Sequence, residues 1–90
     1  MQVRWTAPAA QDLEDITLYI LKDSESAARS VAKALYDAAN SLDLLPSRGR
    51  VGRVPGTREL VVPGLPYIVH YEVADTAVQI HGARNWPEEG

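Results

Sequence analysis

Four arginines lie within eleven residues of this sequence, at positions 48, 50, 53 and 58. The segment contains no acidic residue, whereas the parts of the chain before and after it carry net charges of −3 and −4. A guanidinium group binds a carboxylate or a phosphate through two parallel hydrogen bonds. The spacing of Arg48, Arg50, Arg53 and Arg58 therefore indicates one of two things. It is either a loop that recognises anions of RNA or of a protein partner, or a solvated loop whose arginines pair with acidic residues of helices.

A second group of reactive side chains lies near the C-terminus, where His81, Arg84 and Trp86 follow one another closely. A histidine and an arginine at the rim of a sheet could serve as a general acid and a phosphate clamp. They could equally contact a partner protein, with Trp86 as an anchor, or Trp86 could fold back to complete a small core. His70 lies in the middle of an apolar run and is interpreted as a half-exposed cross-strand residue.

The composition limits the classes of function. Ninety residues predict a single domain, 1–90, and the absence of cysteine excludes a disulfide framework. A pI near 5.2 argues against broad binding of nucleic acid. Two histidines without a clear third ligand, and glycines that do not form a phosphate loop, predict neither a metal nor a cofactor. No apolar run is long enough to cross a membrane, so we expect a cytoplasmic protein without a membrane partner.

The N-terminal half predicts one strand and two helices. Alternation over 2–6 indicates a short strand, and Thr6 can cap a helix whose apolar residues, from Ala9 to Ile20, recur at spacings of three and four. After a break at 22–26, capped by Asp23 or Ser24, a second apolar periodicity continues to about Leu45, where Pro46 ends it. Two amphipathic helices joined by a short break predict a helical hairpin.

The C-terminal half predicts an antiparallel meander after a loop at 47–56. Strands are expected over 57–62, 67–73 and 77 to about 83, with turns at 63–66 and 75–76. The fold class is therefore α+β with the order β-α-α-β-β-β, in which the helical hairpin packs on a small, largely antiparallel sheet.

In this order and spacing the chain resembles the RelE/ParE superfamily of toxins. The residues that carry the resemblance extend over nearly the whole chain: Trp5-Thr6, Asp12-Leu13, Ile16, Tyr19-Ile20, Leu45-Pro46, Gly49-Arg50, Gly52-Arg53, Thr57-Arg58-Glu59-Leu60, Pro66-Tyr67-Ile68-Val69, Tyr71 and His81-Gly82-Ala83-Arg84 with Trp86-Pro87. The resemblance implies a toxin of a type II toxin–antitoxin pair with the same β-α-α-β-β-β fold. It also implies a cognate antitoxin that wraps the toxin, and contact with operator DNA only through that antitoxin.

The superfamily has two branches, and the resemblance favours the ParE-like one, whose members bind DNA gyrase without an active site of their own. The RelE-like branch cleaves mRNA on the ribosome and typically carries an arginine after the aromatic residue of the central strand, where this chain has Ile68. If the chain is such a ribonuclease, Arg58, His81 and Arg84 are its candidate catalytic residues. If it is ParE-like, the candidate residues for binding the target and the antitoxin are Arg48, Arg50, Arg53, Arg58, Arg84 and Trp86. A third alternative is an inactive relative that only binds its antitoxin.

Overall fold

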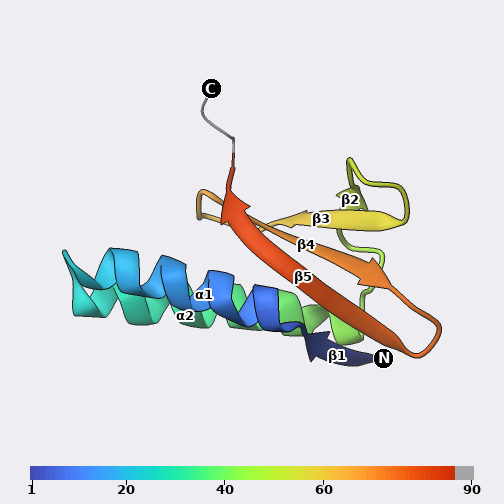
Figure 1. The fold of residues 1–90 in the computed structure, drawn as a ribbon, viewed down its shortest axis with the longest axis horizontal. Coiled ribbons are helices and arrows are strands. Elements are labelled where there is room, and N and C mark those ends of the chain that lie inside the picture. The colour runs from blue at the N-terminus through green and yellow to red at the C-terminus, as the bar shows by residue number, and fades with distance from the viewer. Residues whose placement is uncertain (87–90) are drawn as a thin grey trace.

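A computed structural model of the chain describes residues 1–86 (Figure 1). It contains a helical hairpin and a five-stranded sheet. The elements are β1 (Gln2–Trp5), α1 (Ala7–Leu21), α2 (Glu25–Asn40), the 3-10 turn η1 (Ser41–Asp43), β2 (Arg50–Val51), β3 (Thr57–Val61), β4 (Tyr67–Val73) and β5 (Ala77–Asn85). The predicted α+β class and the helical hairpin are confirmed.

The strands lie in the order β1-β5-β4-β3-β2. The meander of β3, β4 and β5 is antiparallel as expected, and β1 returns beside β5 in parallel, with Gln2 opposite Ala77. One strand was not predicted. Arg50 and Val51, which were expected to be loop, pair with Glu59 and Arg58 at the edge of the sheet.

Local capping explains where both helices begin. The Thr6 hydroxyl accepts a hydrogen bond from the Ala9 amide at 3.3 Å, and the Ser24 hydroxyl accepts one from Ala27 at 3.1 Å. The predicted end of the second helix near Leu45 is wrong, because α2 ends at Asn40 and the chain tightens into η1. Leu42 is fully buried there, but Leu45 is 59% exposed, so its helical spacing reflected no contact with the core.

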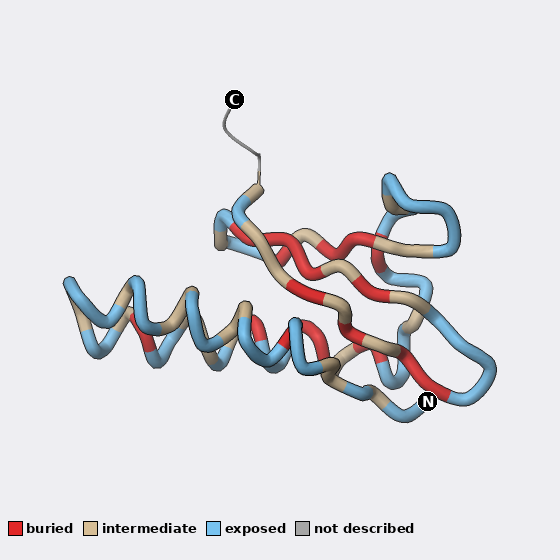
Figure 2. Tube along the Cα trace, in the orientation of Figure 1, coloured by how far each residue is buried: buried red, intermediate tan, exposed pale blue. Residues whose placement is uncertain are grey.

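The helices cover one face of the sheet, and the core lies between the two layers (Figure 1). Figure 2 shows buried residues concentrated along β3, β4 and β5, while the far end of the helical hairpin is mostly intermediate or exposed. Leu35, Leu42 and Tyr71 are completely buried. The small side chains of Ala38 and Ala39 let α2 pack closely against the sheet. The other face of the sheet, which the helices do not cover, is called the outer face below.

The last strand is longer than predicted, since β5 runs to Asn85. It contains a β-bulge, because Tyr71 lies opposite Ile80 while the preceding His70 lies opposite Gly82. His81 is therefore the extra residue of the bulge, between Ile80 and Gly82, and no residue of β4 lies directly opposite it. Among residues 1–86, no helix has the length and apolar character that crossing a membrane requires.

Candidate functional site

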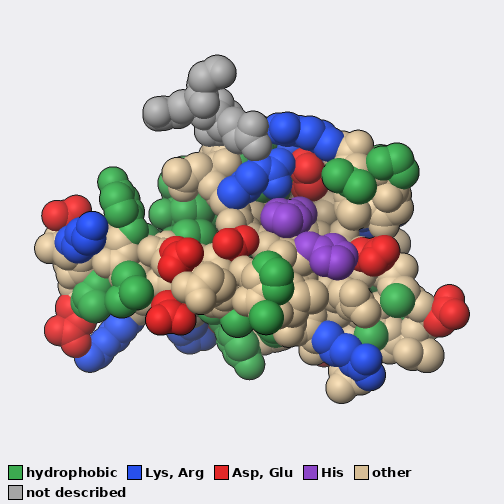
Figure 3. Space-filling view, in the orientation of Figure 1, with side chains coloured by type: hydrophobic (Ala, Val, Ile, Leu, Met, Phe, Trp, Pro, Cys, Tyr) green, Lys and Arg blue, Asp and Glu red, His purple; other side chains and the backbone are tan. Residues whose placement is uncertain are grey.

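The outer face of the sheet carries a cluster of ionisable side chains. Strand pairing places Glu59 beside His70, and Ile68 beside Arg84, while Tyr71 and Val69 point to the helices. Figure 3 shows the histidines in contact with neighbouring arginine and acidic side chains over the sheet. Strands β3, β4 and β5 contribute to the cluster, and Arg50 of β2 adjoins it, so residues far apart in the sequence meet there.

A buried carboxylate organises the arginines of this face. Glu59 is only 7% exposed, and its Oε1 accepts from Arg50 Nη2 at 3.2 Å while its Oε2 accepts from Arg84 Nη2 at 3.3 Å. The Arg50 guanidinium lies over the Trp86 ring, 5.1 Å from its centroid. Trp86 therefore completes the outer face and does not fold into the core beneath the helices. One carboxylate thus fixes two guanidiniums in adjacent positions.

The pKa of Glu59 is lowered despite its burial. Burial by itself raises the pKa of a carboxyl group, but hydrogen bonds from Arg50 and Arg84, the charge of Arg84 and the backbone of Arg53 together outweigh that effect. Glu59 is therefore ionised at neutral pH, and its charge compensates part of the positive charge of the arginine loop.

A glycine brings a histidine of the outer face close to an acid of α1. A Cβ atom on Gly82 would lie 2.5 Å from Asp12 Oδ2 and 2.6 Å from His70 Nε2, so a side chain here would displace both groups. Asp12 Oδ2 also accepts a hydrogen bond from the Ala83 amide at 3.1 Å. Asp12 thereby fixes α1 to β5 beyond the end of β1 and satisfies a donor on that edge.

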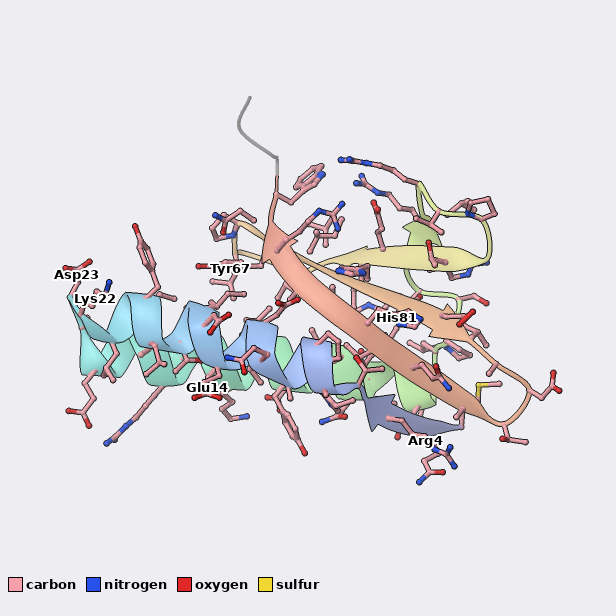
Figure 4. All side chains as sticks on the ribbon, in the orientation of Figure 1. Arg4, Glu14, Lys22, Asp23, Tyr67 and His81 are labelled. Carbon is pink, nitrogen blue, oxygen red and sulfur yellow. The ribbon has the colours of Figure 1, made fainter. Side chains whose placement is uncertain are left out.

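The second histidine belongs to the same face but to another pair. His81 Nε2 lies 3.4 Å from Glu72 Oε1, and both side chains are partly exposed. Figure 4 shows His81 well separated along the sheet from Tyr67, which lies opposite Asn85 at the end of β5. The outer face thus holds two histidines, each beside a carboxylate, with Arg84 on the same strand as His81.

We expect the stability of the protein to decrease between pH 7.5 and pH 5.5 because of His70. Burial of the ring, followed by the charge of Arg84, lowers the pKa of His70 below 6.5, and His81 acts in the same direction. Asp12 and Glu59 oppose this shift. Since the unfolded chain then binds the proton more tightly than the folded one, stability is present above pH 6.5 and is lost as the pH falls through the lowered pKa. Urea unfolding should show a smaller loss for His70→Gln, and an unchanged loss would contradict the assignment.

Two of the predicted arginines lie on the other side of the sheet. Arg58 is opposite Tyr71, whose side chain faces the helices, and it donates to the carbonyl of Gly49 at 2.7 Å. Arg48 donates to the hydroxyl of Ser41 at the end of α2 at 2.8 Å. The single basic loop expected from the sequence is therefore divided between the two faces, and Arg58 does not join His81 and Arg84. Within residues 1–86, Arg48, Arg50 and Arg58 form no ion pair with an acid of the helices; Arg50 pairs with Glu59 on β3.

Three residues that organise these surfaces were not predicted from the sequence: Glu59, Asp12 and Tyr71. Strand alternation offers a signal for the first, because residues 59, 68, 70 and 84 must share a face once the meander is aligned. No local signal identifies Asp12 or Tyr71, whose partners are 71 and 25 residues away. Within the described part of the chain, no three histidine or acidic residues come together in a way that could hold a metal ion.

Solved structures share this architecture. A chain from the chromosomal ParDE toxin–antitoxin system of P. aeruginosa superposes with a TM-score of 0.86 at 25% identity, covering 94% of this chain and 95% of the other. A chain from the RelBE2 toxin–antitoxin complex of Mycobacterium tuberculosis superposes with a TM-score of 0.66 at 23% identity, covering 93% and 95%. The second likeness shows a common fold. The architecture is thus that of the small α+β toxins of these systems.

Sequence comparison gives the family. Residues 3–84 match the model of the ParE toxin of the type II toxin–antitoxin system parDE. Y4kP of Sinorhizobium fredii, a protein named as a toxin, is 36% identical over 90 residues, covering 97% of this chain and 94% of the relative. Toxin RelE2 of Caulobacter vibrioides is 42% identical over 87 residues, covering 92% and 97%. The chain therefore belongs to the ParE toxin family, within the RelE/ParE superfamily of type II toxin–antitoxin systems.

Proposed function

We propose that this toxin arrests growth by binding DNA gyrase, without a chemical step of its own, and that its antitoxin silences it at the outer face. The observation that carries the first part is the position of Arg58. RNA cleavage through the 2′-hydroxyl requires a base, an acid and a group that stabilises the phosphorane. Arg58 is engaged with the backbone of Gly49 on the helix side, away from His81 and Arg84.

The arginines of the outer face suit an acidic segment of an antitoxin. Glu59 already orients the Arg50 guanidinium, so little side-chain entropy is lost when a carboxylate of the antitoxin binds its exposed side. Half of the Arg50 side chain remains exposed, and Trp86 beneath it adds an aromatic contact. Arg53 follows Arg50 by three residues, its backbone lies beside Glu59, and we propose it as a further contact of the antitoxin.

An open groove beside the outer face offers a partly apolar surface in addition to the charged one. It has a volume of about 280 Å³ and lies between α1 and the ends of β4 and β5. Its lining residues are Asp15, Ile16, Tyr19, Tyr67 and Asn85. Tyr19 is 69% exposed, which is unusual for so large an aromatic side chain. An antitoxin that contacts the arginines and continues along α1 would cover it. Operator DNA would then be contacted by the antitoxin alone.

The alternative function is that of a ribosome-dependent mRNA endonuclease. One observation favours it: His70, His81 and Arg84 share the outer face, and each histidine lies close to a carboxylate. In that case His81 and Arg84 would act with His70 in place of Arg58. The third alternative is an inactive relative that only binds its antitoxin. Such a protein would still bind the antitoxin through the arginine surface but would not inhibit growth.

Pulse labelling after induction of the toxin without antitoxin distinguishes these functions. We expect DNA synthesis to stop first, with a DNA-damage response, because gyrase is the target. If protein synthesis stops first, the gyrase proposal is wrong and His70→Ala and Arg84→Ala become tests of catalysis. If neither stops although the protein is folded, the chain is the inactive relative.

Binding to the cognate antitoxin should weaken by about tenfold or more in an Arg50→Gln/Arg53→Gln variant, because charged contacts at such interfaces are worth over 1.4 kcal/mol. Neutral substitutions are preferred to charge reversal, since a glutamate at position 50 would face Glu59. The matched control is Arg29→Gln, on the exposed surface of α2, where Arg29 pairs with Glu25. Calorimetry that gives equal affinities for both variants would contradict antitoxin binding at this surface.

A further inference from the structure

A second surface lies on the helix side of the sheet, at the loop that follows η1. Its residues form an open hollow of about 460 Å³ lined by Leu44, Leu45, Pro46, Ser47 and Arg48. Leu44 is 82% exposed and Leu45 is 59% exposed. Single exposed leucines are common, but two adjacent ones at the rim of a hollow form an apolar surface that a monomer does not need.

The loop is held rigidly although its leucines face solvent. The amides of Leu44 and Leu45 both donate to the Ser41 carbonyl, and the Arg48 amide donates to that of Leu45 at 3.0 Å. From the sheet, the Tyr71 hydroxyl donates to the Pro46 carbonyl at 2.7 Å and accepts from the Gly49 amide at 2.9 Å. A loop fixed in this way presents its side chains at little entropic cost to a ligand.

Arg48 gives the hollow a charge. Its guanidinium donates to Ser41 Oγ at 2.8 Å, which orients the group beside the leucines and leaves other N–H donors for a ligand. Asp43, at the start of the loop, carries the opposite charge, and its carbonyl accepts from the N-terminal ammonium group at 2.8 Å. Arg58 adds a second guanidinium, which donates to the carbonyl of the lining residue Ser47 at 3.5 Å, so positive charge exceeds the single negative charge of Asp43.

We infer that the 44–48 hollow docks a segment of a partner protein that places an apolar side chain against Leu44 and Leu45 and a carboxylate on Arg48. An RNA is less suited, because the lining residues offer no aromatic ring for base stacking. A second copy of this chain is the other occupant to be tested, through the oligomeric state in solution. The partner is thus an apolar and acidic protein segment.

This inference goes beyond the proposed function, because the hollow and the outer face lie on different sides of the sheet. The hollow is held by Tyr71 and Arg58, which face the helices, whereas Arg50, Arg84 and Trp86 lie on the outer face. A partner at the hollow can therefore bind while an antitoxin covers the outer face. The test needs neither gyrase nor antitoxin, so its failure would leave the proposed function untouched.

The test uses the full chain labelled with nitrogen-15 and a synthetic peptide of two leucines flanked by glutamates. Amide spectra should show saturable shifts centred on residues 44–48. The dissociation constant should rise by about tenfold or more in a Leu44→Ser/Leu45→Ser variant, because apolar burial is lost, and by about threefold or more in Arg48→Gln. All three side chains are exposed, so an unchanged melting temperature checks that the variants fold.

Several results would overturn the inference. Shifts that do not saturate, shifts centred elsewhere, or equal binding of a control peptide with serines in place of the leucines would each exclude this docking mode. A single-stranded RNA oligonucleotide that saturates residues 44–48 when the peptide does not would assign the hollow to nucleic acid. Concentration-dependent dimerisation that the Leu44→Ser/Leu45→Ser variant abolishes would assign it to a second copy of this chain.

Discussion

Tyr71→Phe should lower the free energy of unfolding by about 1–3 kcal/mol, although it removes a single oxygen atom. The Tyr71 side chain is completely buried, and its hydroxyl bonds both the Pro46 carbonyl and the Gly49 amide. Gly49 is itself buried, so its amide would lose its partner in a place that water does not reach. Urea unfolding at pH 7 measures the difference.

The control for this prediction is Tyr36→Phe. Tyr36 is 53% exposed and stacks on Trp5 through its ring, so the loss of its hydroxyl should change the free energy of unfolding by less than about 0.5 kcal/mol. Equal effects at the two positions would show that the Tyr71 hydroxyl does not support the 46–49 loop.

A larger change at position 71 should show how much the whole Tyr71 side chain contributes to the free energy of unfolding. Tyr71→Ala removes the ring as well and should cost about 3–5 kcal/mol. For a chain of this length, whose total stability is about 5–14 kcal/mol, that is a large fraction. The alanine variant therefore tests the core, and the phenylalanine variant tests the loop alone.

Glu59→Gln should lower the free energy of unfolding at pH 7 by about 1–3 kcal/mol and also remove part of the sensitivity to acid. The variant keeps the shape of the side chain but leaves Arg50 and Arg84 without the charge that they share. Because both arginines are partly exposed, water compensates some of the loss, and the effect stays below that of breaking a fully buried ion pair.

The stabilisation by Glu59 should decrease as the pH falls. The pKa of Glu59 is lowered from 4.5 in the folded protein, so its stabilising effect is complete above pH 4.5 and is lost as the pH falls through the lower value. The stability curves of the wild type and Glu59→Gln should therefore converge below pH 4. Curves that stay parallel from pH 7 to pH 3 would show that the carboxylate charge does not matter.

The matched control is Glu25→Gln. Glu25 also pairs with an arginine, Arg29, but on an exposed helix surface where 69% and 80% of the two side chains are accessible. Such pairs contribute less than about 1 kcal/mol. Tryptophan fluorescence adds a second measurement, because freeing Arg50 should disturb Trp86 in Glu59→Gln and not in Glu25→Gln.

Local patterns in the sequence determine most of the fold. Helical periodicity, the caps at Thr6 and Ser24, and the turns between the three last strands depend on residues close in sequence, so the β-α-α-β-β-β order could be predicted. Patterns failed where local spacing did not reflect a contact. Leu45 continues the helical spacing but is exposed to solvent, and Arg50–Val51 becomes a strand only because β3 is available to pair with it.

The candidate site shows the same division. The sequence by itself predicted a set of binding residues, Arg48, Arg50, Arg53, Arg58, Arg84 and Trp86, and it carried the resemblance to the toxin superfamily. The tertiary structure alone decided that neighbouring arginines separate. Arg50 lies opposite Glu59 and shares its face of the sheet, whereas Arg58 precedes Glu59 on β3 and therefore points to the other face. It alone also selected Glu59 as the shared partner of Arg50 and Arg84, since that choice depends on strand register, which is set by packing across the whole sheet.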